Sequence, residues 1–198
     1  MGPGSRAWET NEGKAMTATT FTIDPTGASA GLLAARLLLG LAMAAHGSQK
    51  LFGWFGGYGL AGTGGFFEQL GFRPGRAYAA AASTSEVVGG LLVALGLLGP
   101  IGPALVLSVM VVAAVAVHWK NGFFAGSNGI EVPFLYAAGV VALALTGPGR
   151  FSLDALLGLE WLWAPRIAAV ALAIGVLGAL ANLASRQPAS APQTATAA

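Results

Sequence analysis

Apolar residues dominate five long stretches of the chain, which are separated by short segments rich in glycine, proline and charged residues. The fourth stretch is short for the roughly 20 residues that a helix needs to cross a bilayer. We expect it to tilt little, to thin the bilayer locally or to extend back through Glu131. The pattern predicts five transmembrane helices, an odd number that places the two termini on opposite sides of the membrane. The stretches are Ala28–Leu51, Ala77–Leu98, Ile101–His118, Val132–Thr146 and Pro165–Leu183.

The second and third stretches are separated by a very short connection. Gly99, Pro100, Gly102 and Pro103 cluster there, and glycine and proline are the strongest local signals for a turn. The two stretches are therefore predicted to form an antiparallel helical hairpin.

Composition supports an integral membrane protein. Only 9% of the 198 residues are charged and 55% are hydrophobic, whereas soluble domains carry about 25% charged residues. The net charge of +2 is spread without a basic patch, so no nucleic-acid partner is predicted. The expected surroundings are the lipid bilayer of the cell membrane (inner or plasma), crossed several times. The chain has no cysteine, which excludes disulfides, thiolate metal sites and thiol redox chemistry by the chain itself.

The two ends of the chain are polar. Residues 1–27 form a polar N-terminal segment, and residues 185–198 form a tail of Pro, Ser, Thr and Ala that is typical of disorder. The first apolar stretch begins too far into the chain to be a signal peptide, so it is expected to be retained. Our hypothesis is that translation starts at Met16, which follows Glu12-Gly13-Lys14, a tripeptide that a purine-rich ribosome-binding site can encode.

Charged and polar residues inside the apolar stretches are the candidates for function. A charge in hydrocarbon costs roughly 2.5–3.5 kcal/mol on insertion scales, so it usually faces a partner or a cavity. His46 and His118 lie near the ends of stretches that run in the same direction, which places both at one membrane face with Lys50 and Glu131.

Arg36 and Glu86 enter the membrane from opposite faces. At 1.5 Å per residue, Glu86 lies roughly 13 Å and Arg36 roughly 12 Å from the end of its own stretch. Measured from the face that Glu86 enters, Arg36 lies about 18 Å deep in a 30 Å core, so the depths of the two residues differ by about 5 Å. The sequence therefore suggests a buried Arg36–Glu86 ion pair, which could serve a site or only lock two helices together.

Structural roles are alternatives for the two histidines. His46 precedes Lys50 by one helical turn, so it is either a pocket residue or an interfacial residue bonded to a backbone carbonyl. His118 precedes Trp119-Lys120, an aromatic and cationic pair typical of a membrane interface. Two histidines could also ligate haem or a metal, but no other ligand pattern accompanies them, and no metal site is predicted.

The acidic residues in the later part of the chain have simple explanations as well. Glu131 precedes the fourth stretch, where an acid complements the dipole of a helix N-terminus. Asp154, beside Ser152, has the same interpretation.

A glycine-rich segment follows the first stretch. Residues 57–62 satisfy G-x-G-x-x-G, but that motif indicates nucleotide binding only between a strand and a helix, and this chain has no strand pattern. We interpret the segment as a compact interfacial loop with aromatic rings at headgroup depth. The rings are those of Trp54, Phe55, Tyr58, Phe66 and Phe67, which could line a mouth for an amphipathic ring such as a quinone.

Several motifs over roughly residues 30–158 occur in an order that resembles the DoxX family of small membrane proteins. The resemblance implies an all-α transmembrane four-helix bundle over residues 28–158, and the fifth helix, residues 164–184, lies outside the usual pattern. The motifs are the run Arg36–Gly57, Leu60-Ala61-Gly62-Thr63 with Phe66-Phe67, Ser85–Leu92, His118 with Asn121–Phe124, Glu131-Val132-Pro133, and Gly147–Arg150 before Ser152-Leu153-Asp154.

The resemblance implies a link to redox chemistry. Relatives include the large membrane subunit of a thiosulfate:quinone oxidoreductase and a membrane component that joins soluble redox enzymes in oxidative-stress and thiol homeostasis complexes. We therefore expect a membrane subunit or anchor of a redox complex, at most part of a quinone-linked oxidoreductase, with a redox partner subunit. A non-enzymatic scaffold and a small transporter or channel are the alternatives. In the redox interpretation, Arg36 and Glu86 hold the floor of a quinone-accessible pocket, and its mouth is lined by His46, Lys50, His118 and Glu131.

Overall fold

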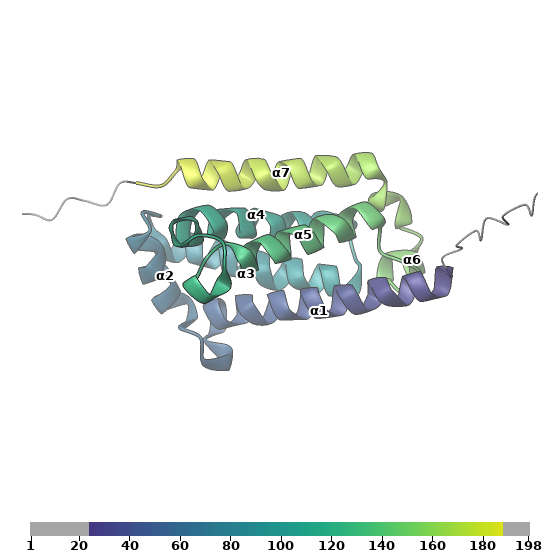
Figure 1. The fold of residues 1–198 in the computed structure, drawn as a ribbon, viewed down its shortest axis with the longest axis horizontal. Coiled ribbons are helices and arrows are strands. Elements are labelled where there is room, and N and C mark those ends of the chain that lie inside the picture. The colour runs from purple at the N-terminus through teal and green to yellow at the C-terminus, as the bar shows by residue number, and fades with distance from the viewer. Residues whose placement is uncertain (1–23, 188–198) are drawn as a thin grey trace, which may run out of the picture.

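The computed structural model describes residues 24–187, which contain helices and connecting turns but no strand (Figure 1). The expected start at Met16, most of the polar N-terminal segment and residues 188–198 of the tail lie outside the described residues. The all-α prediction is confirmed.

Each of the five predicted stretches forms a helix. Four are long and apolar enough to cross a membrane, with α4 continuing to Asn121 through a π-helical turn at Ala114–His118 and a 3-10 turn. The remaining helix, α5, corresponds to the short fourth stretch. It has 16 residues, about 24 Å at 1.5 Å per residue, and begins at Glu131. The structure thus selects the backward extension of this stretch. The long helices are α1 (Pro25–Phe52), α3 (Gly75–Leu95), α4 (Ile101–Ala113), α5 (Glu131–Thr146) and α7 (Pro165–Ala184).

These helices alternate in direction between two ends of the bundle, which are marked by α2 (Gly59–Gln69) and α6 (Leu153–Leu157) in Figure 1. We call them the α2 end and the α6 end. The first helix begins at the α6 end and the last finishes at the α2 end. The described termini therefore lie at opposite ends of the bundle, as the odd number of helices predicts.

The glycine-rich segment corrects one expectation, because residues 59–69 form a helix rather than a compact loop. Glycine lowers intrinsic helix propensity by about 1 kcal/mol, but here it permits close packing. A Cβ added to Gly64 would lie 3.0 Å from the Cα of Arg76, and one added to Gly75 would collide with the Gly64 carbonyl oxygen. Tertiary contact between α2 and α3 explains why the local sequence preference does not prevail.

Small residues bring α1 and α3 into backbone contact. A Cβ added to Gly40 would lie 2.5 Å from the Gly90 carbonyl oxygen, and one added to Gly47 would lie 2.8 Å from the Glu86 Cβ. Because lipid is as apolar as a leucine side chain, such close packing is a main source of helix association in membranes. The same contact sets the depth of Glu86 against α1.

The predicted hairpin of α3 and α4 is confirmed. Gly89 and Gly102 face each other near the turn, and the turn is held by the carboxylate of Asp154, which accepts hydrogen bonds from Leu98 N (3.0 Å) and Gly99 N (2.7 Å). The carboxylate also accepts from Trp163 Nε1 at 2.8 Å. Ser152, rather than Asp154, caps α6 through Ala155 N. The fully buried Asp154 therefore organises the α6 end instead of simply complementing a helix dipole.

Candidate functional site

An open cavity of about 1040 Å³ lies at the α2 end, lined by residues of α1, α2, α3, α4 with its π-helical turn, α5 and, through Asn182, α7. Its size is at the upper end of the roughly 300–1,000 Å³ typical of ligand pockets. Most of the lining is apolar or aromatic. The polar and aromatic residues of the wall include His46, Gln49, Lys50, Tyr58, Thr63, Phe66, Phe67, Phe72, Tyr78, His118, Tyr136 and Asn182.

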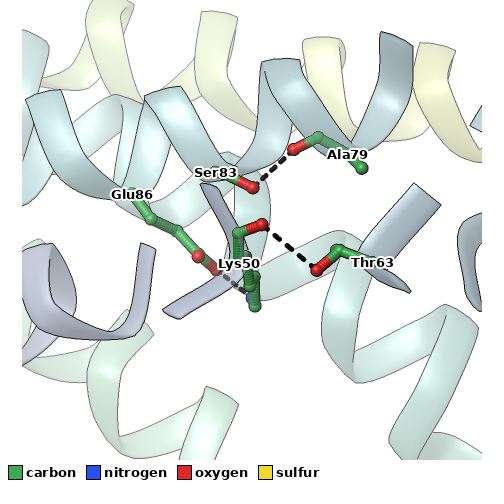
Figure 2. A network of polar contacts seen from close by, with 5 residues as sticks. All are labelled: Lys50, Thr63, Ala79, Ser83 and Glu86. Atoms are coloured by element: carbon green, nitrogen blue, oxygen red, sulfur yellow. Dashed lines mark hydrogen bonds and ion pairs between the residues drawn. The ribbon is translucent and has the colours of Figure 1, made fainter. Parts of the chain in front are cut away.

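A buried ion pair lies at the wall of this cavity. Lys50 Nζ donates to Glu86 Oε1 at 2.5 Å; the Glu86 side chain is fully buried and that of Lys50 is 25% exposed. Figure 2 shows Lys50 of α1 and Glu86 of α3 directed toward each other, with Thr63 Oγ1 of α2 donating to the Lys50 carbonyl at 3.3 Å. Lys50 thus joins three helices at the cavity wall.

The second carboxylate oxygen of Glu86 is a buried acceptor. Within residues 24–187, Glu86 Oε2 has no hydrogen-bond partner. An unsatisfied buried acceptor costs about 1–3 kcal/mol. This atom is therefore a vacant acceptor beside the ion pair, open to a further hydrogen-bond donor.

The expected Arg36–Glu86 pair is wrong, because Glu86 is paired with Lys50. Arg36 lies against Gly96, which follows α3, and Glu86 is ten residues earlier on the same helix. At 1.5 Å per residue the two levels are about 15 Å apart along the axis. The predicted depths assume that the apolar stretches end at the same level. In the structure α1 extends beyond the end of α3, so Arg36 lies nearer the α6 end than predicted.

Arg36 belongs to a separate polar cluster at the α6 end. It is 1% exposed, its Nη2 donates to the Phe151 carbonyl, and the buried Asp154 lies within electrostatic range. The opposite charge of Asp154 partly offsets the cost of burying the guanidinium, whose Nε and Nη1 have no hydrogen-bond partner among the described residues. Arg36 therefore does not form the floor of the cavity.

Three of the four residues predicted for the mouth reach the cavity. His46, Lys50 and His118 line it, whereas Glu131 is absent from its wall. Glu131 Oε2 instead accepts from Ala125 N at 2.7 Å in the preceding loop. Its place at the start of α5 is as expected, but its carboxylate fixes the loop between α4 and α5.

The two histidines have different surroundings. His118 Nδ1 contacts the Asn128 carbonyl oxygen at 2.8 Å, so the backbone bond considered for His46 is found at His118. His46, on α1, lines the same cavity one turn before Lys50. Among the described residues no group of three or more potential metal ligands gathers.

The aromatic residues of the glycine-rich segment divide into two groups. Tyr58, Phe66 and Phe67 line the cavity, whereas Trp54 does not. Trp54 and Tyr58 are exposed, Tyr58 by 88%. Three of the five predicted rings thus line the cavity, whereas Trp54 and Phe55 do not.

Sequence reasoning missed Tyr136 and the π-helical turn. Tyr136 lies one helical turn into α5 and lines the cavity. It was not predicted because its single hydroxyl lies within an otherwise apolar stretch. Ala116, Val117 and His118 line the cavity from the π-helical turn. Such turns often occur at functional sites, but their hydrogen-bond shift leaves no recognisable signal in the sequence.

The DoxX family model matches residues 31–119. No match was found among curated proteins or among solved structures. The matched region runs from within α1 to just past the π-helical turn and includes His46, Lys50, Glu86 and His118. Tyr136, Asn182 and the whole of α7 lie beyond it.

Proposed function

Residues 31–119 of this membrane protein belong to the DoxX family, and from this premise we propose that it is the quinone-binding membrane subunit of a redox complex in the plasma membrane. The observation that carries the proposal is the cavity at the α2 end, where an apolar and aromatic wall meets His46, Lys50 and, behind Lys50, Glu86.

The residues of this cavity fit a quinone. The carbonyl oxygens of a quinone need donors, and the wall offers the His46 imidazole, the Lys50 ammonium and the Tyr136 hydroxyl. The rings of Phe66 and Phe67 provide apolar and stacking surface for the head group. When bound, a quinone would supply two-electron, two-proton chemistry.

The chain's own contribution is binding and proton handling. The His46 imidazole lines the cavity, where it can donate a hydrogen bond to a quinone carbonyl oxygen and pass on a proton. The Lys50–Glu86 ion pair lies behind the wall, and Glu86 Oε2 is a buried acceptor without a partner among the described residues.

Electrons would come from a partner. The chain has no cysteine, and no cluster of three or more potential metal ligands occurs among residues 24–187. A redox protein docked at one membrane face would therefore carry the electron-donating centre, and this chain would hold the acceptor.

Purification in mild detergent, with mass spectrometry of proteins and extraction of lipids, tests partner and quinone together. We expect bound quinone in the native protein and about three- to tenfold weaker binding of decylubiquinone in His46→Ala, the effect of losing one hydrogen bond. Trp161→Ala is the control, because Trp161 is exposed and outside the cavity. Its decylubiquinone affinity should not change.

The opposite outcome would favour a different role. A redox partner without bound quinone, together with an unchanged decylubiquinone affinity in His46→Ala, would contradict quinone binding. The same result would support a non-enzymatic scaffold.

A further inference from the structure

The fifth membrane helix, α7, lies outside the matched family region and forms part of the cavity wall. Its face toward α4 is built from small residues, and a Cβ added to Gly175 would lie 2.6 Å from the Ala104 carbonyl oxygen. Farther along, Gly178 faces Ser108 of α4. Asn182, one turn later, lines the cavity and donates to the Gly178 carbonyl at 2.8 Å. The last turns of α7 therefore cover α4 at the depth of the cavity.

The wall under these turns is made mainly of Ala, Ser and Val side chains. Near their hairpin turn α3 and α4 are in close contact through Gly89 and Gly102. Toward the α2 end both helices line the cavity instead, α3 through Ala81, Ala82 and Ser85 and α4 through Ser108, Val109 and Val112. Ala, Ser and Val thus dominate the seam between α3 and α4 where the cavity begins, with Tyr78 and Met110 beside them, and the end of α7 lies over it.

The end of α7 is fastened to the connection between α2 and α3 by a set of contacts that we call the latch. Arg186 Nε donates to the Leu70 carbonyl at 2.8 Å, and its guanidinium lies 5.5 Å from the centre of the Phe72 ring. Gln187 N donates to the Gly71 carbonyl at 2.8 Å. The Tyr78 and Ser185 hydroxyls are 2.8 Å apart. Residues 185–187, expected to begin the tail, are thus in contact with the bundle.

The latch contacts are suited to opening. The Arg186 and Ser185 bonds are exposed, and single hydrogen bonds of this kind contribute about 0.5–1.5 kcal/mol each. Leu70, Phe72 and Tyr78 belong to both the latch and the cavity wall. Release of the latch therefore uncovers the cavity itself.

We propose that the cavity receives its ligand from the bilayer, through the seam between α3 and α4 that the C-terminal end of α7 closes. The ligand is then a lipid-soluble amphiphile with a polar head for His46 and Lys50 and an apolar tail along the seam. This inference rests on the proposed function in that the cavity binds a ligand. It differs in assigning the route of entry, and in giving α7 a role.

Labelling of a single cysteine tests the route, because the chain has no cysteine of its own. Ser108→Cys places a thiol in the cavity wall under α7. In lipid nanodiscs, its rate of reaction with a membrane-soluble maleimide is compared with its rate toward a charged, water-confined maleimide. Arg186→Ala removes two latch contacts, and Arg166→Ala at the start of α7 is the matched control.

We expect Arg186→Ala to accelerate labelling by the membrane-soluble reagent roughly three- to tenfold, as the loss of one net hydrogen bond shifts an opening equilibrium. Labelling by the charged reagent should not accelerate, and Arg166→Ala should leave both rates unchanged. Gly71→Ala is a second latch variant, because a Cβ there would collide with the Gln187 carbonyl oxygen. It should also accelerate labelling by the membrane-soluble reagent.

Unchanged labelling in both folded latch variants would overturn the proposal, as would acceleration of the charged reagent to the same extent. Circular dichroism identifies a variant that has lost its fold. The assay contains no quinone, so a failure of quinone binding would leave the entry route standing. A failure of the entry route would equally leave quinone binding intact.

Discussion

At the scale of single residues, the molecule separates its buried charges into two clusters. Lys50 and Glu86 pair at the cavity wall, whereas Arg36 and Asp154 lie at the α6 end. Each cluster combines a cation with an anion, which is how a membrane bundle holds charges that lipid would reject. The first cluster borders a cavity, and the second fixes a turn.

Removal of one member of the cavity pair should destabilise the protein more than removal of both. Lys50→Met leaves Glu86 buried without its partner, and we expect a loss of about 1–3 kcal/mol, because Lys50 is partly exposed and the pair is not fully desolvated. Lys50→Met with Glu86→Gln should recover part of this loss. Unfolding in detergent, followed by circular dichroism, measures the coupling.

Arg36→Gln with Glu86→Gln is the matched control for this cycle. The two residues are about 15 Å apart along the helix axis, so their effects should add within about 0.5 kcal/mol. Strong coupling there, with none between Lys50 and Glu86, would contradict the pairing.

At the scale of helices, close contact between backbones positions the site. α1 and α3 meet through Gly40, Gly47 and Gly90. This contact places Glu86 of α3 level with Gly47, which lies about one turn before Lys50 on α1. α2 packs on α3 through Gly64 and Gly75 and brings aromatic rings to the cavity. Glycine therefore serves here as an interface residue rather than as a helix breaker.

Alanine substitution at two glycines of α1 should affect the melting temperature differently. Gly40→Ala adds a Cβ that would lie 2.5 Å from the Gly90 carbonyl oxygen, so the helices must separate, and we expect a clear fall in melting temperature. Gly31→Ala meets nothing within 4 Å and should be neutral or slightly stabilising, since alanine is the better helix former. Thermal unfolding of both variants in the same detergent makes the comparison; equal melting temperatures would remove the close contact as a source of stability.

At the scale of the whole molecule, the five alternating helices define two ends that carry different polar residues. The α2 end carries the cavity, the exposed aromatic residues Trp54 and Tyr58, and Trp119 of α4. The α6 end carries the Asp154 cluster and the turn between α3 and α4. A partner that exchanges electrons with a cavity ligand should therefore dock at the α2 end.

Sidedness can be measured with cysteines at exposed positions. Tyr58→Cys and Asn121→Cys lie at the α2 end and should react with an impermeant maleimide from the same side of the membrane. Arg150→Cys, between α5 and α6 at the other end, should react from the opposite side. Tyr58 and Asn121 labelled from different sides would disprove the assembly of His46, Lys50 and His118 into one site.

The sequence by itself determined the helical class, the five apolar helices, four of them long enough to cross a membrane, the hairpin of α3 and α4 and the shared face of His46, Lys50 and His118. All of these follow from hydrophobic length, turn residues and the parity of the crossings, which are properties of one chain segment at a time. Only the tertiary structure decided that Lys50 rather than Arg36 pairs with Glu86, that Glu131 lies off the cavity, that residues 59–69 are helical and that Tyr136 and Asn182 reach its wall. Those outcomes depend on the rotation and axial offset of each helix against its neighbours, which close glycine contacts set and which a residue's position in its own helix does not encode.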